Sequence, residues 1–461
     1  MTGQKTTTLH AGTALLPSGW ADDVLIRIGA DGRIKEVRAN TPPPADTETR
    51  AIILPALTNL HSHGFQRAMA GLTERRGAGP ADSFWTWRET MYRFLDRMTP
   101  EHVGAITAFA QMEMLEAGYA ASAEFHYLHH QPGGKPYDTP AELSARIVAA
   151  AAETGAGLTL LPVLYCYGGL DKRPLGAGQL RFGNDPEGFG RVLEGAEQAA
   201  RTLPADCLTG VAPHSLRAVD ADMLAEVARL RPDRPIHMHI AEQPAEVEEV
   251  RAATGARPVE WLLSNADVTG RWCLIHCTHM SPGETRALAG SGAVAGLCPI
   301  TESNLGDGIF DGMRFARHGG VFGVGSDSNI RISLAGELRT LEYSQRLKHT
   351  GRAMYADADR SAGRVLYEAA LQGGAQAAGR DSGAISVGKW ADLIALDAGS
   401  VHLAHRRGDR LLDSLIFAGG GRMVTDTWAA GRHVVSDGRH RGRARIASAY
   451  RRALGCLLAA V

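Results

Sequence analysis

The chain has 461 residues, of which 44% are hydrophobic and 21% charged, an ordinary composition for a globular protein with a sizeable core. Its formal net charge of -1 gives no electrostatic reason to expect a nucleic acid or an acidic membrane as a partner. The N-terminus lacks an apolar stretch of signal-peptide length, and no run of about eighteen apolar residues follows, so we expect a cytoplasmic protein that spans no membrane.

The two ends of the chain are predicted to be rich in strands. Strand or turn segments recur at 21–29, 30–33, 34–37, 388–397, 425–430 and 433–438. The first three have the alternating pattern and the turn of a hairpin, and a helix is expected to end the chain. The sequence thus predicts one small sheet domain built from both ends, residues 1–54 and 388–461.

The middle of the chain, residues 55–387, alternates between apolar strand-like runs and helical stretches such as 244–253 and 334–346. The eight runs lie at 52–57, 120–125, 158–164, 208–212, 235–240, 272–276, 293–297 and 321–325. Near-continuous apolar strands are typical of parallel sheets covered on both faces, so this order predicts an α/β protein with a (β/α)8 TIM-type barrel. The alternative is an open doubly wound sheet, which calls for a glycine-rich phosphate-binding turn that this sequence lacks.

Polar side chains gather just past these runs, at the positions that form the C-terminal face of a barrel. They are His61, His63, His126, Tyr165, His214, His239, Glu242, His276, Thr301 and Asp327. A lone histidine at such a place is more often structural, but repeated imidazoles beside a carboxylate are what zinc or a similar divalent ion requires. The six cysteines include no CxxC pair, so we expect free thiols in a reducing compartment rather than a zinc ribbon.

His61 and His63 are the strongest pair, because residues two apart in a strand point the same way and can bind one ion. His239 ends another strand and is a third candidate ligand. Glu242 follows it at a place suited to acid/base work beside the metal, although a carboxylate here also suits the start of a helix.

Three further residues complete this set of strand-end groups. His237 shares a strand face with His239 but lies two residues earlier in the strand, farther from the strand end, which favours a structural role. His276 lies inside an apolar run, and Asp327 ends a glycine-rich strand. An aspartate there is often a turn residue; beside three histidines we interpret it as the fourth group at the metal.

These residues, in this order, resemble the amidohydrolase superfamily, whose fold is a (β/α)8 barrel with a small β-sandwich formed from both chain ends. Within it, the strings at 59–74, 84–93, 301–310 and 341–347 resemble the family of N-formimidoyl-L-glutamate deiminases of histidine degradation. One departure is Gly64, where this family would have alanine. The resemblance implies the metal ligands His61, His63, His239 and Asp327, the catalytic residues Glu242, His276 and Asp327, and a homodimer.

The resemblance also bears on the metal. Binuclear relatives bridge two ions with a carboxylated lysine at the end of strand four, but residues 208–215 contain no lysine, and Lys172, the nearest, follows strand three. We therefore expect one divalent ion per chain. Ligation by three histidines and an aspartate favours Zn2+, with iron and manganese left open.

A glutamate-derived substrate brings two carboxylates, which arginine forks bind in a bidentate fashion. The resemblance assigns substrate binding to Gln66, Arg88, Tyr127, His214 and Arg217. Two of these have simpler interpretations: Arg88 as a surface charge, and Gln66 as a support for the His61–His63 pair. The segment 64–100, which carries Arg88, is long enough to cover the barrel mouth.

Two rival functions remain open from the sequence. One is a deaminase of an aminated heterocycle on the same scaffold, such as guanine, cytosine or an adenosyl-type compound. The other is a non-catalytic barrel kept as a binding module, although every expected ligand position is filled. The predicted reaction is hydrolysis of N-formimidoyl-L-glutamate to N-formyl-L-glutamate and ammonia.

Overall fold

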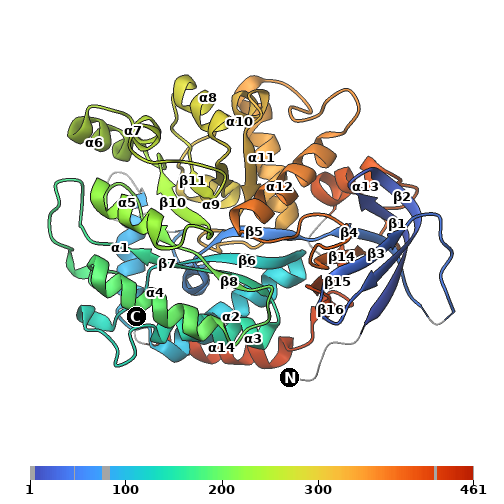
Figure 1. The fold of residues 1–461 in the computed structure, drawn as a ribbon, viewed down its shortest axis with the longest axis horizontal. Helices are drawn as coiled ribbons and strands as arrows, with labels where there is room; N and C mark the ends of the chain where they lie inside the picture. Colours follow the sequence, from blue (N-terminus) through green and yellow to red (C-terminus); the bar gives the residue numbers. More distant parts are fainter. Residues whose placement is uncertain (1–5, 46, 75–83, 420–422, 460–461) are drawn as a thin grey trace.

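The structure is a computed structural model that describes residues 6–45, 47–74, 84–419 and 423–459. Its centre is a barrel of parallel strands (Figure 1). The barrel strands are β5 (Leu57–Ser62), β6 (Tyr119–His126), β7 (Gly157–Leu164), β8 (Leu208–Thr209), β9 (Ala212–Pro213), β10 (Ile236–Ile240), β11 (Trp272–His276), β12 (Val294–Leu297) and β13 (Val321–Val324). Parallel ladders join β5 to β8 and β10 to β13. Two bridges, Ser62 to Asp327 and Val211 to Ile236, close the ring.

The barrel strands are apolar because both of their faces are covered. Every residue of β5, β6, β7, β10, β11 and β12 is buried. The expected barrel strands are therefore confirmed, with two differences. The run predicted at 52–57 ends in the terminal sheet at Pro55, and the barrel strand begins at Leu57. The run at 208–212 is interrupted between β8 and β9, where a Cβ on Gly210 would lie 2.6 Å from the Pro235 carbonyl oxygen.

Helices surround this barrel. They are α2 (Pro100–Ala117), α3 (Glu142–Thr154), α4 (Pro186–Ala200), α5 (Ala221–Leu230), α6 (Pro244–Thr254), α7 (Pro258–Asn265), α8 (Pro282–Ser291), α9 (Pro299–Leu305), α10 (Gly312–Arg317), α11 (Leu334–His349), α12 (Ala362–Ala377) and the C-terminal α14 (Arg443–Leu458). Several begin at a side chain that accepts a hydrogen bond from the first-turn backbone, as Thr99 does for α2 and Ser333 for α11. Many also begin with proline, whose missing N–H costs nothing at that position.

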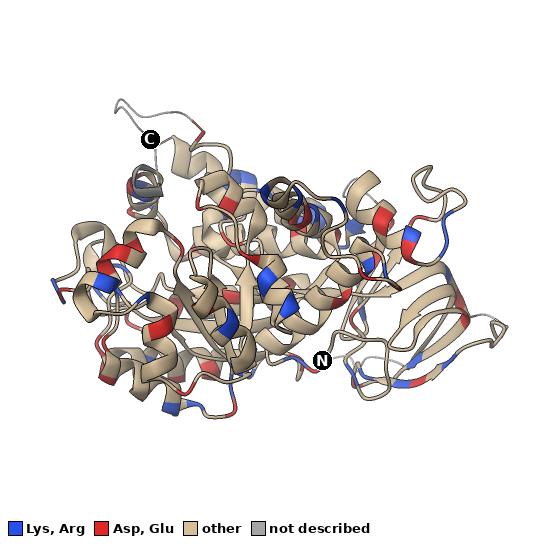
Figure 2. Ribbon diagram, turned by 90° about the horizontal axis from the view of Figure 1, so that it is seen from above, with Lys and Arg blue, Asp and Glu red and all other residues tan. Residues whose placement is uncertain are grey.

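Shorter elements complete the connections. They are η1 (Gly64–Met69), α1 (Phe84–Leu95), η2 (Pro132–Gly134), η3 (Ala177–Gln179), α13 (Asp409–Asp413) and η4 (Ser414–Ala418). Acidic and basic residues are interspersed along the helices around the barrel (Figure 2). No helix within the described residues is both long and apolar enough to cross a membrane. The six cysteines are free thiols, three of them buried.

The two chain ends form one eight-stranded sheet beside the barrel, drawn in blue and red in Figure 1. Its strands, in spatial order, are β17 (Arg439–His440), β16 (Arg432–Ser436), β15 (Val424–Ala429), β14 (Leu393–Leu396), β4 (Glu48–Pro55), β1 (Thr7–Leu16), β2 (Gly19–Ile28) and β3 (Ile34–Arg38). The predicted hairpin is the pair β2–β3. The sheet is tied to the barrel by Arg380, which is buried between Asp206, at 2.9 Å, and Asp392, at 2.7 Å.

Candidate functional site

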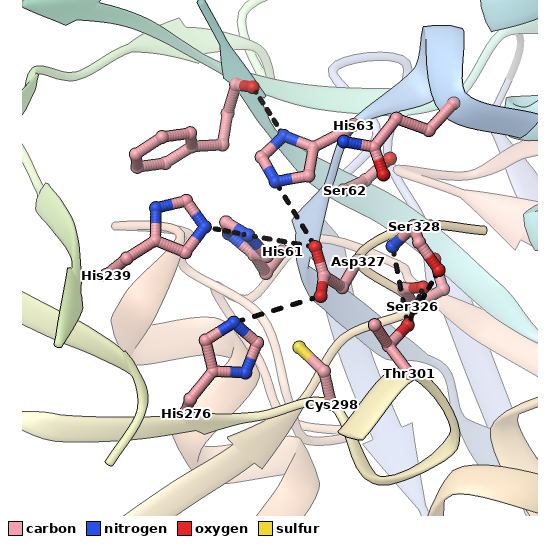
Figure 3. A network of polar contacts seen from close by, with 12 residues as sticks. His61, Ser62, His63, His239, His276, Cys298, Thr301, Ser326, Asp327 and Ser328 are labelled. Carbon is pink, nitrogen blue, oxygen red and sulfur yellow. Dashed lines mark hydrogen bonds and ion pairs between the residues drawn. The ribbon is translucent and has the colours of Figure 1, made fainter. Parts of the chain in front are cut away.

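The C-terminal ends of the barrel strands bring imidazoles and a carboxylate together (Figure 3). His61 lies in β5 and His63 directly after it, His239 lies in β10, His276 ends β11, and Asp327 follows β13. The closing bridge from Ser62 to Asp327 places Asp327 beside His61 and His63. The Asp327 N–H donates to the His61 carbonyl oxygen, and the His63 N–H donates to the Asp327 carbonyl oxygen, both at 2.9 Å. Barrel closure therefore builds this cluster.

Four of these side chains offer atoms that converge on one point. The Asp327 Oδ1 atom lies 3.5 Å from His61 Nε2 and 3.2 Å from His63 Nε2, and the Nε2 atoms of His61 and His239 are 3.1 Å apart. One ligand atom from each of the four lies within 4.8 Å of the others, and all four residues are buried. A buried cluster of three imidazoles and a carboxylate is a donor set that suits a tetrahedral divalent ion.

Backbone carbonyls orient two of the imidazoles with respect to the cluster. The His63 Nδ1 atom lies 2.9 Å from the Phe125 carbonyl oxygen, and the His239 Nδ1 atom lies 3.3 Å from the His214 carbonyl oxygen. Each Nδ1–H can donate there, which leaves the Nε2 lone pair facing the cluster, as metal-bound histidines require. Burial lowers the pKa of His61 to about 3 and that of His239 well below its usual value. Neutral imidazoles are the form that ligates a metal.

A second possible set contains His276, Cys298 and Asp327. This set offers one imidazole against three in the first set, and its three donors are one fewer than a tetrahedral ion needs. The residues therefore fit a metal best at His61, His63, His239 and Asp327.

His276 is the centre of an acid/base group at the edge of the cluster. Its Nε2 atom lies 3.7 Å from Glu242 and 3.8 Å from Asp327, and its Nδ1 atom lies 3.3 Å from Glu302. Burial by itself would lower the pKa of His276, but these three carboxylates outweigh it and raise the pKa. Burial also raises the pKa of Glu242. Two groups in contact whose pKa values are shifted by their surroundings are typical of proton-transfer sites.

The backbone at these strand ends is strained. His276 has a φ of 71° and Asp327 a φ of 45°, in the left-handed region that non-glycine residues seldom adopt. Asn329 supports the backbone around Asp327, because its Nδ2 donates to Ser62 Oγ and to the His63 carbonyl oxygen, both at 3.1 Å. Such conformations persist where surrounding bonds hold them, most often at functional sites.

The cluster opens into a pocket of about 580 Å³. The pocket is lined by His63, Gln66, Trp87, Arg88, Met91, Tyr92, Tyr127, Tyr165, Phe182, His214, Arg217, His239, Glu242, His276, Leu305, Asp327 and Ser328. All five residues expected to bind substrate are among them. The structure thus gathers around one cavity the catalytic and substrate-binding residues predicted from the sequence, with His61 buried beneath.

The polar groups opposite the cluster include two arginines, Arg88 and Arg217. The Arg217 Nε atom is buried without a hydrogen-bond partner, and within the described residues its guanidinium lies in no ion pair. Gln66 donates to the Tyr127 hydroxyl at 2.7 Å, while its own carbonyl oxygen is buried without a partner. Burial and the neighbouring Arg217 lower the pKa of His214. The pocket therefore holds donors suited to an anion.

Three residues considered in the sequence analysis lie outside the pocket. His126 ends β6 but stands 4.9 Å from the His129 ring and does not line the pocket, because Phe125 and Tyr127 occupy the inward face. His237 is fully buried with its Nε2 atom 2.7 Å from the Ala377 carbonyl oxygen, as expected for a structural residue. Lys172 is 58% exposed and pairs with Asp220, so it cannot bridge metals.

Sequence reasoning gave no role to Glu302 or to the aromatic wall of the pocket. Tyr165 had a signal, since it follows a barrel strand. Glu302 had none beyond its place in the string 301–310. Of the segment 64–100, residues 75–83 lie outside the described residues. At Gly64, an added Cβ would lie 3.0 Å from Thr107 Oγ1, so an alanine here would require Thr107 to move slightly.

Comparison with known proteins gives consistent matches. The model of the Amidohydrolase family matches residues 52–434, and that of the N-terminal domain of formimidoylglutamate deiminase HutF matches residues 6–51. Formimidoylglutamate deiminase from Pseudomonas aeruginosa is 49% identical over 98% of this chain and 99% of its own length. A 5-methylthioadenosine/S-adenosylhomocysteine deaminase from Natronomonas pharaonis is 27% identical over 84% of this chain and 82% of its own.

Solved structures agree with the fold. An amidohydrolase from Brucella melitensis superposes with a TM-score of 0.94 at 49% identity, covering 98% of this chain and 100% of that one. An adenosine deaminase from Xanthomonas campestris with bound zinc has a TM-score of 0.81 at 22% identity, covering 98% of each chain. The second match shows the same fold.

Proposed function

The chain belongs to the amidohydrolase family, and we propose that it is a formimidoylglutamate deiminase of histidine degradation. The reaction hydrolyses the C–N bond of the terminal imino group of N-formimidoyl-L-glutamate. Water adds to the formimidoyl carbon, the bond from that carbon to the terminal nitrogen breaks, and N-formyl-L-glutamate and ammonia are released. The chemistry needs an activated water, a group that moves protons, and donors that hold two carboxylates.

The observation that carries this proposal is that metal-ligand candidates and two arginines line one pocket. Arginine forks recognise carboxylates, and a heterocyclic base carries no carboxylate to meet them. The 49% identity with the Pseudomonas aeruginosa deiminase over nearly the full length of both chains supports the same substrate.

We propose His61, His63, His239 and Asp327 as the ligands of one divalent ion per chain, with zinc as the metal. When bound, such an ion acts as a Lewis acid and makes water a nucleophile near neutral pH. The single-ion assignment is supported by the absence of lysine from 208–215 and by the surface position of Lys172.

The chain's own side chains account for the remaining steps. Arg88 and Arg217 bind the carboxylates, and Gln66, Tyr127 and His214 add hydrogen bonds. Glu242 takes the proton of the attacking water and delivers it to the departing nitrogen, and Asp327 shares in this transfer. His276, 3.7 Å from Glu242, steers and polarises the attacking oxygen.

We further infer the surroundings in which the protein acts. It is a cytoplasmic homodimer that binds a small dicarboxylate, with no nucleic acid or membrane as partner. Residues 55–387 form the catalytic barrel domain. The ends, 1–54 and 388–461, form a small β-sandwich, supported by a separate apolar cluster that includes Leu9, Ile26 and Trp428.

An ammonia-release assay with purified, metal-loaded protein tests this function. N-formimidoyl-L-glutamate, guanine, cytosine and 5′-methylthioadenosine are compared at equal concentration. The proposal expects turnover of the first compound and little or none of the others. Preferred turnover of a heterocycle would instead favour the ring deaminase. If none of the four compounds releases ammonia, the proposed catalytic role is wrong.

A further inference from the structure

Helix α1 forms one wall of the pocket. It contributes Trp87, Arg88, Met91 and Tyr92 to the lining. The helix lies between the first and second barrel strands in the sequence and is not part of the ring around the barrel. The geometry of the substrate site therefore depends on what holds α1 in place.

The C-terminal end of α1 is held by a buried arginine from another loop. Arg181, in the connection between β7 and α4, is 1% exposed. Its guanidinium donates to the carbonyl oxygens of Leu95, the last residue of α1, of Met98, at 3.1 Å, and of His130, with Nε at 2.7 Å. No carboxylate of the described residues forms an ion pair with it.

This arrangement suits the end of a helix. The last carbonyls of a helix lack intrahelical partners and carry the negative end of its dipole, so a cation there is favourable. Burying a guanidinium without a counter-ion is otherwise costly. The Arg181 carbonyl in turn accepts the N–H groups of His129 and His130, each at 2.9 Å. Arg181 thereby joins α1, the loop after β6 and the loop after β7.

A second contact packs Tyr92 of α1 against the same loop. Tyr92 packs so closely on Gly178 that a Cβ there would lie 2.4 Å from the tyrosine ring. The Phe182 ring centroid lies 6.1 Å from that of Tyr92. The Tyr92 hydroxyl accepts a hydrogen bond from Arg88 Nε. The loop 178–182 thus reaches Arg88 through Tyr92.

We propose that Arg181 is a positioning residue for substrate binding, which fixes α1 and, through Tyr92, the guanidinium of Arg88 in the pocket. Arg181 itself does not line the pocket, so it acts only through the helix. The inference rests on the proposed function for the identity of the substrate, but not for the anchoring of α1.

Arg271 offers a matched control. It also donates to three backbone carbonyls, those of Arg234 at 3.0 Å, Ala228 at 3.1 Å and Arg231 at 2.5 Å, and so holds the end of α5. It directly precedes β11 and therefore lies at the N-terminal end of the barrel, away from the pocket. Arg181→Met and Arg271→Met each remove the hydrogen bonds from one guanidinium to backbone carbonyls at the end of a helix, in two different helices.

The test measures kcat and KM for N-formimidoyl-L-glutamate together with hydrogen exchange along 84–95. Arg181→Met should raise KM by roughly 10- to 100-fold through a displaced binding group and change kcat less than about threefold, because substrate and transition state lose the same contact. Exchange in α1 should become faster. Arg271→Met should leave both measurements as in the wild type.

Three further variants keep the test decisive. In an Arg88→Gln background, adding Arg181→Met should raise KM less than about twofold, since no guanidinium remains to be positioned. Arg181→Lys should restore part of the wild-type KM. Gly178→Ala should push Tyr92 outward and raise KM even if Arg181→Met does not fold.

The proposal is overturned if KM stays at the wild-type value in both Arg181→Met and Gly178→Ala, or if Arg271→Met raises KM equally. Full additivity with Arg88→Gln would also overturn it. If the wild type does not turn over this substrate, the proposed function fails, and hydrogen exchange alone then tests whether Arg181 anchors α1. Faster exchange in α1 of Arg181→Met supports the anchoring, and unchanged exchange rejects it.

Discussion

Arg217→Met is the sharpest test of the substrate class. Arg217 lines the pocket and follows the fourth barrel strand, its Nε atom is buried without a partner, and within the described residues it forms no ion pair. Methionine preserves much of the side-chain length and removes the charge and the donors. The loss should therefore appear in substrate binding and not in folding.

The size of the effect follows from the bonds removed. A carboxylate held by one guanidinium fork receives two charge-assisted hydrogen bonds, each worth about 1.5–3 kcal/mol. Because Arg217 is only partly buried, we take the low end, about 3 kcal/mol in total. At about 1.4 kcal/mol per factor of ten, kcat/KM should fall roughly 100-fold. Arg217→Lys keeps the charge but loses the fork, and should fall by less.

The assay measures kcat/KM on three substrates. These are N-formimidoyl-L-glutamate, its analogue built on 4-aminobutyrate, which lacks the α-carboxylate, and its analogue built on L-2-aminobutyrate, which lacks the γ-carboxylate. The substitution should have little effect on whichever analogue lacks the carboxylate bound by Arg217. Arg191→Met, at an exposed arginine paired with Glu187, is the control. An equal loss on all three substrates would refute the reasoning.

The remaining predictions concern the catalytic group, the metal and the fold. Glu242→Gln should lower kcat about 10²- to 10⁴-fold, as expected for loss of proton transfer, with a nearly unchanged KM in steady-state assays; a kcat within threefold of the wild type would exclude the role. Chelation should abolish ammonia release and lower the melting temperature, both restored by Zn2+, and metal analysis should give one ion per chain; two ions would contradict the single-site assignment. Arg380→Met leaves buried Asp392 without its salt-bridge partner and should lower the free energy of unfolding by about 3–5 kcal/mol in denaturant unfolding. Arg360→Met, at an exposed pair with Asp357, should lower it by less than about 1 kcal/mol; equal losses would contradict a larger contribution from the buried Arg380 pair.

Local patterns in the sequence were enough to predict most of the barrel. Apolar runs separated by helical stretches identify parallel strands, because strands covered on both faces have few polar residues. The same logic marked His61 and His63, since the period of a strand points them to one side. It misplaced the first barrel strand, because an apolar run that continues through Pro55 does not reveal where the chain leaves one sheet for the other.

What the sequence by itself determined is therefore the set of strand-end groups from which the site is built. Only the tertiary structure decided which of them meet. The bridge between Ser62 and Asp327 closes the barrel and joins groups 265 positions apart, strand alternation turns His126 outward, and Glu302 reaches His276 from a separate helix. The anchoring of α1 by Arg181 is of the same kind. These contacts depend on the register and closure of distant strands, and a local pattern of residues carries no information about either.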